Sequence, residues 1–449
     1  MLLVAAGYLE SGSPQTQPPK PITVTEYARA CPVQVNPTAL AAGRVVAHPD
    51  TVTNAIELPG EATIEALEEP DTWAATTVEK SALRAVELRN RDSEGAGFVA
   101  FAAANGTGKT GGGFAVTECP GVSPESWFVG AGSNTRHLST LVLTNLGDTP
   151  AIADVEMFGA NGTVEVVDGE GIVLDAHTTR RIALDDVAAG EAELAVRVNT
   201  KRGALTATMR DTSTAVFKGS EWIAPTNPPA RVQTITGLPS GASGRELIVV
   251  NPGNVTAEVG IEVLGKEGMI VADQFDEVKV PAGSLKTFTV PRSAGSEAVS
   301  LRLRSSQNIA ASVRVASSDK DFAYGVASEQ VAGPAVIPLA MSGTLEAMKP
   351  TLLLVAARQS STVLVEAFDT DTTHRGSIEI DVPAGRTVAF DLDKLGRFDS
   401  SLDDLAYLVV TPARPMWGAV AFAEEEAVSI LPLTEAPLTV LAPHVQPGR

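Results

Sequence analysis

Cysteine and histidine are scarce in this chain, which limits the metal and redox chemistry that it can carry. Its 449 residues include two cysteines, Cys31 and Cys119, and five histidines. Two cysteines cannot complete a structural zinc site, which takes about four ligands, and neither lies in a Cys-x-x-Cys motif. The histidines are scattered singly, without the spacing of a metal hydrolase: His48, His137, His177, His374 and His444. We therefore expect no metal site and no cofactor.

Positive charge is also in short supply. Lysine and arginine total 34 against 54 aspartates and glutamates, so the formal net charge is -20, and no basic stripe interrupts the acidic background. The summed field repels polyanions. This balance argues against nucleic acid or an anionic membrane surface as a partner, and it favours solubility and attraction to cations or basic partners.

Motifs for catalysis are missing as well. No Gly-x-Ser-x-Gly elbow presents a nucleophilic serine. The segment Gly106–Thr110 contains Gly-Lys-Thr, but Ala103 replaces the first glycine of a P-loop, and three glycines at 111–113 cannot open the helix that such a loop needs. We interpret this segment as a hairpin loop. Catalysis by two carboxylates in a cleft stays open as an alternative, and we predict that the protein is not an enzyme.

The two cysteines lie far apart in the sequence, and each precedes a proline. We predict a disulfide between Cys31 and Cys119, which in an oxidising compartment stabilises a fold by about 4 kcal/mol in the chain-entropy model. This bridge ties the N-terminal segment to the end of the first group of strands. The alternative is two buried free thiols.

The chain begins with MLLVAAGYLESG, an apolar run with no basic flank and too short for a membrane span of about 20 residues. SGSPQTQPPKP follows as a tether rich in Pro, Gln and Ser. We interpret residues 1–20 as the remnant of a membrane anchor and its tether. The protein is thus expected to be extracytoplasmic, on the cell surface, held by an N-terminal helix that is missing or truncated here.

One passage occurs three times in the chain. Residues 141–164 align without a gap on 247–270, and a shorter, more diverged copy begins at 351–368, where Glu366 matches Glu262. The shared positions of the first two copies are mainly hydrophobic residues, glycines and an asparagine, with one glutamate: Leu141/Leu247, Asn145/Asn251, Gly147/Gly253, Ala151/Ala257, Glu156/Glu262, Gly159/Gly265 and Gly162/Gly268. Such positions build a fold and form no catalytic constellation.

Each copy has the pattern of short strands. Apolar residues alternate along Glu258–Val263, and turns rich in Gly, Pro and Asn, such as Asn251–Asn254 and Val280–Gly283, interrupt the pattern. Val-Pro-Ala-Gly recurs at 382–385 and, degraded to Leu-Asp-Ala-His, at 174–177. About seven or eight strands in about 100 residues predict an all-β fold of tandem immunoglobulin-like β-sandwich domains, because a propeller blade has only about 40–50 residues.

The predicted organisation is three full repeats preceded by an incomplete one. The parts are the anchor remnant and tether at 1–20, an N-terminal β-domain at 21–125, and β-sandwich repeats at 126–228, 229–333 and 334–449. Proline-rich connectors at 223–230 and 333–338 predict a semi-rigid rod or arc. The incomplete domain is expected to borrow a strand, for which Leu438–Ala442 is the candidate.

Candidate interaction sites are few. Trp127 and Phe128 open the first full repeat and are the possible interaction residues, since an exposed aromatic ring is what a sugar-binding face needs; burial in the core is the alternative. Acidic loops contain Asp369 and Asp371, and Asp399, Asp403 and Asp404, without a full calcium-binding pattern. We expect these loops to be solvated. The repeated Glu156, Glu262 and Glu366 are expected to face outward from their strands.

Several of these motifs resemble a known group of proteins. Cys119-Pro120, Trp127–Gly132, the strand Leu141–Asn145 and the Val-Pro-Ala-Gly turn are similar to those of secreted or membrane-anchored actinobacterial proteins grouped as a domain of unknown function. The resemblance covers most of residues 30–440. It implies an N-terminal membrane anchor and a gene neighbour that encodes a large membrane glycosyltransferase of the cell envelope, and it brings no catalytic residues.

The sequence and the resemblance together lead to one hypothesis. We predict a non-catalytic extracytoplasmic scaffold or accessory subunit that supports cell-envelope glycan assembly, with a membrane protein such as an envelope glycosyltransferase as partner. A carbohydrate-binding or adhesive module is the alternative, and a cluster of exposed Trp and Tyr would favour it. A glycan-acting hydrolase would require two buried carboxylates about 5–10 Å apart in a deep cleft.

Overall fold

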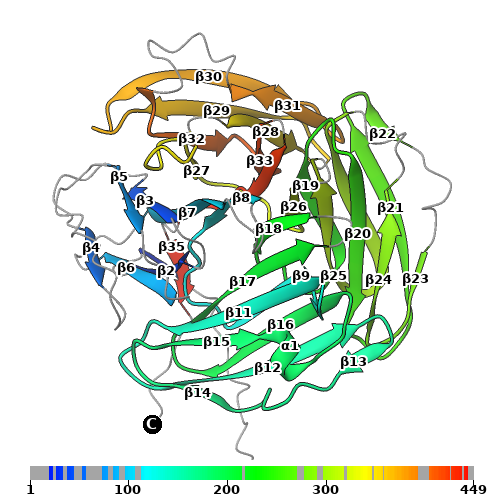
Figure 1. Cartoon of the computed structure of the whole chain (residues 1–449). Coiled ribbons are helices and arrows are strands. Elements are labelled where there is room, and N and C mark those ends of the chain that lie inside the picture. The colour runs from blue at the N-terminus through cyan, green and yellow to red at the C-terminus, as the bar shows by residue number, and fades with distance from the viewer. Residues whose placement is uncertain are drawn as a thin grey trace, which may run out of the picture.

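The computed structural model is built almost wholly from antiparallel strands (Figure 1). This confirms the all-β prediction. The structure describes residues 20–23, 27–33, 38–44, 53–56, 73–78, 84–90, 97–106, 113–214, 218–270, 278–290, 297–317, 321–345, 348–356, 358–392, 404–424, 426–436 and 439–442. Within them the single α-helix is one turn, α1 (Leu184–Val187). Most of the expected anchor remnant and tether, residues 1–19, lies outside the described residues.

The N-terminal unit has two layers, with strand orders β2-β6-β4 and β5-β3-β7-β8. Its strands are β2 (Tyr27–Val33), β3 (Thr38–Arg44), β4 (Thr53–Ile56), β5 (Ala74–Val78), β6 (Arg84–Asn90), β7 (Phe98–Gly106) and β8 (Gly113–Glu118). β7 and β8 pair as an antiparallel hairpin in which Gly106 faces Gly113. A strand therefore follows the Gly-Lys-Thr segment where a P-loop would need a helix.

The first copy follows with the layers β13-β12-β16-β9, where β14 also pairs with β12, and β15-β11-β17-β18, where β10 also pairs with β11. Its strands are β9 (Glu125–Ala131), β10 (Ser133–Asn134), β11 (His137–Asn145), β12 (Ala151–Gly159), β13 (Gly162–Val164), β14 (Ile172–Leu174), β15 (Thr179–Ala183), β16 (Leu194–Arg202), β17 (Leu205–Thr214) and β18 (Lys218–Ile223).

In the second copy one long strand serves both layers. The first half of β25 pairs with β19 and β21, and its second half pairs with β20 and β26. The strands are β19 (Ala230–Leu238), β20 (Gly244–Asn251), β21 (Ala257–Gly265), β22 (Gly268–Ile270), β23 (Val278–Val280), β24 (Ser284–Thr289), β25 (Val299–Ala316) and β26 (Phe322–Val326). β25 thus occupies the places of β16 and β17 of the first copy.

The third copy has the layers β27-β32-β29-β30 and β31-β28-β33-β34. Its strands are β27 (Ala335–Pro338), β28 (Lys349–Val355), β29 (Ser361–Phe368), β30 (His374–Val382), β31 (Thr387–Asp391), β32 (Tyr407–Pro412), β33 (Trp417–Glu424) and β34 (Ala427–Pro432). The aligned passages begin on β11, β20 and β28, which lie at the same place in the strand order. The domain boundaries and the immunoglobulin-like assignment stay predictions.

The four units close into a ring (Figure 1). The last strand of each unit, β8, β18, β26 or β34, lies near the centre, and we call these four the inner strands. β8 lies against β18 and β34, and β26 lies against the same two strands. β35 (Thr439–Ala442), the candidate for the borrowed strand, pairs with β1 (Lys20–Thr23) in a two-stranded sheet of their own and not with either of the two sheets described for the N-terminal unit. The expected rod or arc is therefore wrong, because its ends meet.

The connector between the first two copies shows why the chain bends back. Thr226 N–H donates to the carbonyl of Trp127 at 2.8 Å, and the Thr226 hydroxyl donates to the carbonyl of Ala327 at 3.1 Å. Asn227 N–H donates to the same Ala327 carbonyl at 2.8 Å. The connector is thus hydrogen-bonded to both copies, and its prolines do not hold it as a free extended spacer.

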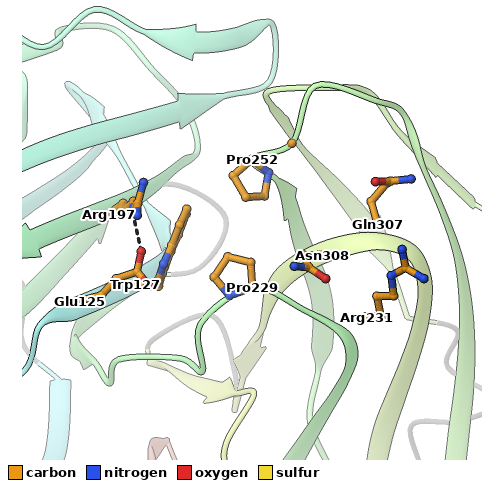
Figure 2. A pocket seen from close by; sticks show the side chains of 9 residues that line it. Glu125, Trp127, Arg197, Pro229, Arg231, Pro252, Gln307 and Asn308 are labelled. Carbon is orange, nitrogen blue, oxygen red and sulfur yellow. Dashed lines mark hydrogen bonds and ion pairs between the residues drawn. The ribbon is translucent and has the colours of Figure 1, made fainter. Parts of the chain in front are cut away.

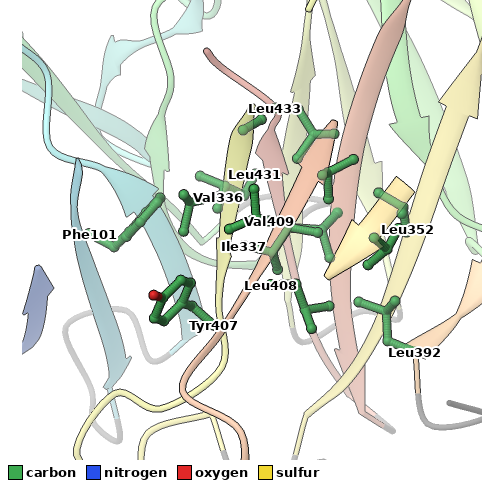
Figure 3. Close-up of a cluster of buried hydrophobic side chains, with 14 of the residues drawn as sticks. Phe101, Val336, Ile337, Leu352, Leu392, Tyr407, Leu408, Val409, Leu431 and Leu433 are labelled. Carbon is green, nitrogen blue, oxygen red and sulfur yellow. The ribbon is translucent and has the colours of Figure 1, made fainter. Parts of the chain in front are cut away.

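The N-terminal unit and the third copy share one hydrophobic cluster (Figure 3). Trp73 stacks on Tyr407 of β32 with ring centroids 4.9 Å apart, and its ring lies 6.2 Å from that of Phe101 on β7. The Trp73 indole N–H donates to the carbonyl of Ala340 at 2.8 Å. Apolar burial of this kind is the main favourable term in holding two elements together. It joins the two ends of the ring.

The repeated asparagine explains one match between the copies. Asn145 at the end of β11 is buried, and its Nδ2 lies 2.8, 3.2 and 3.0 Å from the carbonyl oxygens of Thr149, Leu174 and Asp175. Its Oδ1 accepts from Gly147 N–H at 3.0 Å. One side chain therefore ties two turns to the end of a central strand.

Asn251 repeats this arrangement in the second copy. Its Nδ2 lies 2.8, 3.1 and 3.2 Å from the carbonyl oxygens of Val255, Val280 and Pro281, and its Oδ1 accepts from Gly253 N–H at 3.1 Å. The same bonds join equivalent atoms in both copies. The sequence match thus preserves a fold-building contact.

The turn that follows has a left-handed residue in every copy. Its φ is 53° at His177, 64° at Gly283 and 69° at Gly385. Glycine adopts this conformation without steric cost, which accounts for the last residue of Val-Pro-Ala-Gly. The degraded motif of the first copy keeps the turn with a histidine in its place.

We expect Asn251→Ala to destabilise the protein by about 2–4 kcal/mol, because buried carbonyls lose their donor. Asn145→Ala should have a similar effect. Urea unfolding followed by tryptophan fluorescence measures both, with Asn254→Ala in the exposed part of the same turn as a control that stays near wild type. Equal midpoints for Asn251→Ala and Asn254→Ala would contradict this role.

Candidate functional site

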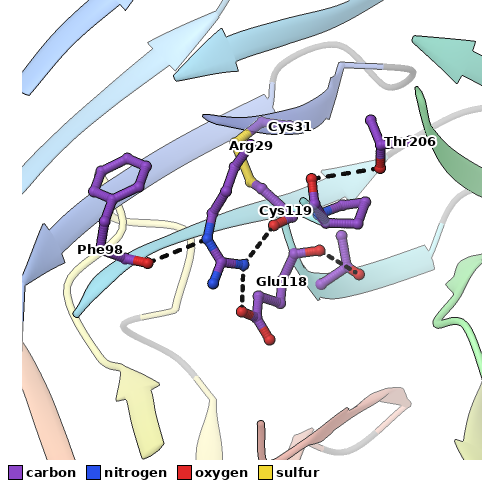
Figure 4. Close-up of a disulfide and its surroundings, with 8 residues drawn as sticks. Arg29, Cys31, Phe98, Glu118, Cys119 and Thr206 are labelled. Carbon is purple, nitrogen blue, oxygen red and sulfur yellow. Dashed lines mark hydrogen bonds and ion pairs between the residues drawn. A yellow bond between two sulfur atoms is a disulfide. The ribbon is translucent and has the colours of Figure 1, made fainter. Parts of the chain in front are cut away.

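The predicted disulfide is present. Cys31 on β2 is bonded to Cys119, which follows β8, across 88 residues of sequence, and both are fully buried (Figure 4). The neighbouring Arg29 donates from Nε to the carbonyl of Phe98 at 3.2 Å and from Nη1 to that of Cys119 at 2.8 Å. Nη1 also contacts the carboxylate of Glu118 at 2.5 Å. A disulfide of this kind is typical of an extracytoplasmic protein.

The candidate interaction residues Trp127 and Phe128 are both buried on β9. Phe128 belongs to the core of the first copy. Trp127 stacks on Phe158 with centroids 5.6 Å apart, and the guanidinium of Arg197 lies 5.7 Å from its ring centroid. Neither residue is presented on an exposed face. Trp417 is the one tryptophan of the described residues that is only partly buried.

Trp127 lines a pocket between the first and second copies, which we name the first junction pocket (Figure 2). The pocket has a volume of about 420 Å³ and is lined by Glu125, Trp127, Arg197, Pro229, Arg231, Pro252, Gly253, Gln307 and Asn308. Arg197 contacts the carboxylates of Glu125 at 2.5 Å and Glu156 at 3.2 Å. Burial lowers the pKa of Arg197, but these two carboxylates outweigh it and raise the pKa above its ordinary value. The positive charge of Arg197 is therefore balanced by carboxylates in this pocket.

A second junction pocket lies between the second and third copies, with a volume of about 660 Å³. It is lined by Val232, Arg302, Arg304, Gln330, Arg358, Gln359, Arg414, Pro415 and Trp417. The two pockets take their walls from corresponding strands, because Arg197 faces Glu156 across β16 and β12 just as Arg302 faces Glu262 across β25 and β21. The outward-facing glutamates predicted from the repeats therefore lie beside these pockets in both copies.

A buried polar cluster between the first and second copies was missed by the sequence reasoning. Asp211 accepts from the hydroxyls of Ser139 at 2.6 Å and Tyr324 at 2.8 Å. The His137 ring contacts Asp211 through Nε2 at 3.0 Å and the carbonyl of Ala192 through Nδ1 at 2.8 Å. Both ring nitrogens face acceptors, so both carry protons. Burial opposes that charge, but Asp211 and Glu193 raise the pKa of His137 above its usual value.

This cluster is not a catalytic triad. Ser139 donates to Asp211 rather than to His137, so the imidazole is not placed to withdraw its proton. A doubly protonated imidazole cannot act as a general base. The three residues lie on the adjacent strands β11 and β17, and their separation in sequence follows no motif, which is why only the pairing of the strands reveals the group.

Two carboxylates lie at the centre of the ring. Asp321, just before β26, accepts from the backbone N–H of Phe114 on β8 at 3.2 Å and of Val428 on β34 at 3.0 Å. Glu221 on β18 accepts from Trp222 N–H at 2.8 Å. Burial raises the pKa of Asp321 to about 7, although the N–H groups that donate to its carboxylate act to lower that pKa. Burial also raises the pKa of Glu221 well above its ordinary value. Both are buried, and neither lines a junction pocket.

The acidic loop of the third copy is satisfied by its own residues. Asp369 accepts from the N–H groups of Asp371 at 3.0 Å and Thr373 at 2.8 Å, and Arg375 Nε donates to it at 2.7 Å. These donors outweigh the cost of desolvation and lower the pKa of Asp369. Asp399 and Asp403 lie outside the described residues. The described part of the chain contains no group of three or more His, Cys, Asp or Glu arranged to hold a metal ion.

No helix in the described part of the chain has the length and apolar character of a membrane span.

Removal of the disulfide by the double substitution Cys31→Ser and Cys119→Ser should lower the free energy of unfolding by about 4 kcal/mol, since it releases a long loop in the unfolded chain. Wild-type protein unfolded under reducing conditions should show the same loss. Tryptic mapping without reductant should recover the two cysteine peptides as one linked species. Unfolding midpoints that do not respond to reductant would contradict the role of the bridge.

Asp321 should make stability depend on pH. Its pKa near 7 in the folded state exceeds the value of about 4 in an unfolded chain, so folding takes up a proton between these values and stability falls as pH rises through them. Asp321→Asn has no carboxylate at this position, so its free energy of unfolding lacks this dependence on pH. Between pH 5 and pH 7.5, we expect the difference in free energy of unfolding between the variant and wild type to change by about 2–3 kcal/mol in favour of the variant.

Urea unfolding at several pH values measures this difference. Asp175→Asn, in an exposed turn, is the control and should follow wild type at each pH. A difference between Asp321→Asn and wild type that does not change with pH would show that Asp321 is already ionised throughout.

Comparison with known proteins places the chain in a family. A search of curated proteins gave no match. Among solved structures, it is similar to an α-L-rhamnosidase from Streptomyces avermitilis complexed with L-rhamnose, at 10% identity and a TM-score of 0.13, covering 91% of this chain. This chain spans 54% of that enzyme, and so low a TM-score establishes no common fold. The family of unknown function DUF5719 matches residues 74–393. The chain therefore belongs to DUF5719.

Proposed function

We propose that the protein is a non-catalytic extracytoplasmic scaffold or accessory subunit that supports the assembly of cell-envelope glycans. In this proposal it is built from tandem immunoglobulin-like sandwiches and is held at the cell surface through its N-terminal segment. The observation that carries the proposal is the closed ring, in which residues shared by the copies hold strands and turns while the walls of the junction pockets differ.

The ring supports a scaffold role because it fixes its surfaces relative to one another. Three kinds of contact hold neighbouring units: the inner strands at the centre, hydrogen-bonded connectors such as Thr226, and bonds such as that from the Thr387 hydroxyl to the carbonyl of Leu264 at 2.6 Å. A partner that contacts two units therefore meets a surface that needs no ordering on binding, which reduces the entropic cost of association.

The buried polar groups support the non-catalytic part of the proposal. The Ser139, His137 and Asp211 group has the wrong hydrogen-bond order for nucleophile activation. Asp321 and Glu221 each accept backbone N–H groups through one carboxylate oxygen at the centre of the ring, and their second oxygens, Oδ1 and Oε2, are buried. A hydrolase needs its two carboxylates at a cleft that admits substrate, and both of these side chains are only 2% exposed.

A carbohydrate-binding or adhesive module is the second candidate, and the junction pockets favour it. Arginine and amide side chains gather beside a tryptophan at both junctions, with Gln307 and Asn308 in the first pocket and Gln330 and Gln359 in the second. Such side chains are suited to sugar hydroxyls. Trp127 offers little ring surface, however, and Trp417 is partly covered by Arg302.

The accessory role is tested by purifying the tagged full chain from native membranes solubilised in mild detergent. We expect mass spectrometry to find a large membrane glycosyltransferase enriched over a control strain that carries the same tag on an unrelated secreted β-sandwich protein. Deletion of the gene should also lower the amount of the envelope glycan. Absence of any glycosyltransferase, both with and without chemical cross-linking, would overturn the accessory role.

A further inference from the structure

The second junction pocket concentrates positive charge in an otherwise acidic protein. Four arginines line it, although the whole chain has a formal net charge of -20. They come from two copies: Arg302 and Arg304 from β25, and Arg358 and Arg414 from loops of the third copy that lie next to β28 and β33. Charges from separate parts of the fold thus converge on one cavity.

One carboxylate serves two of these arginines. Glu262 contacts Arg302 Nη1 at 3.5 Å and Arg304 Nε at 2.8 Å. Arg414 donates instead to the neutral amide oxygen of Gln359 at 3.0 Å. Within the described residues no acidic side chain pairs with Arg358 or Arg414. The pocket therefore holds more positive charge than its surroundings neutralise.

Arg302 is the arginine most affected by this excess of positive charge. Its side chain is buried beneath Trp417, with the guanidinium 5.9 Å from the ring centroid, and its Nη2 has no hydrogen-bond partner. Burial lowers the pKa of Arg302, Glu262 opposes that effect, and the charges of Arg304 and Arg358 lower the pKa further. A buried cation among like charges is unfavourable unless an anion compensates it.

The first junction pocket provides an internal comparison. There Arg197 is balanced by Glu125 and Glu156. Two strand positions change between the copies: Glu125 lies opposite Asn199, and the corresponding pair in the second copy is Val232 opposite Arg304. A carboxylate is replaced by an apolar side chain and an amide by a cation, so one negative charge is lost and one positive charge is gained at equivalent sites, and the second pocket is more positive by two charge units.

We propose that the second junction pocket binds a phosphate or carboxylate group carried by a hydroxylated molecule such as a sugar. The planar guanidinium groups match the oxygens of either anion in bidentate geometry, and the amides of Gln330 and Gln359 are suited to neighbouring hydroxyls. A volume of about 660 Å³ accommodates a small molecule of this size. The rest of the protein is acidic and repels long polyanions. We therefore expect a ligand that carries only one or a few anionic groups. The inference does not require the accessory role.

Isothermal titration of the full chain with glucose 1-phosphate, glucuronate and glucose tests the proposal. We expect at least one of the two anions to bind and neutral glucose not to bind, with affinity falling as salt rises because the contact is partly exposed. Binding of one anion alone identifies the charged group. Binding of glucose as tight as that of the anions, or no anion binding up to about 10 mM, would overturn the proposal.

Substitutions locate the site. Arg358→Gln combined with Arg414→Gln changes two exposed side chains, and we expect it to weaken anion binding by about tenfold or more. Arg231→Gln in the first junction pocket is the matched control and should leave the affinity within about twofold of wild type. Arg302→Gln should also weaken binding, with its fold checked by circular dichroism. Unchanged binding by the exposed double variant would place any anion elsewhere.

Discussion

Closure of the ring depends on how the inner strands meet at the centre. Where β8, β18, β26 and β34 converge, backbone N–H groups are shielded from water, and a buried donor without an acceptor is costly. Asp321 supplies that acceptor, because one oxygen receives the N–H groups of Phe114 and Val428 from two other units. A carboxylate in this place joins three units at once. The cost is desolvation, which appears as a pKa of about 7.

The parts of the fold that follow local rules could be predicted from the sequence. Alternating apolar residues gave the strands, and Gly, Pro and Asn gave the turns, since both depend on neighbours within a few residues. The repeated Asn145 and Asn251 were visible as matches, and the structure adds that they hold equivalent carbonyls. The disulfide could be predicted for a different reason, because two cysteines allow only one pairing.

The ring and its sites could not be predicted, because their contacts join residues far apart in the sequence. Alternation indicates that Glu156 and Glu262 face outward, but it does not say which copy lies opposite them. The proline-rich connectors suggested an extended arrangement, and hydrogen bonds from Thr226 to both copies override that local preference. Trp127 likewise looked like a candidate contact residue, and only the neighbouring Phe158 and Arg197 show how it is covered.

Specificity in such a protein resides where the copies differ. A contact present in every copy, such as the asparagine that ties the turns, serves the fold and cannot distinguish one junction from another. The Arg–Glu pair of β16 and β12 recurs in β25 and β21, yet only the first is surrounded by enough carboxylate to be neutral. Because strand register fixes the backbone, exchanging two side chains changes the charge of a pocket while corresponding strands still form it. Duplication followed by such exchanges gives one ring several distinct surfaces at little cost in stability.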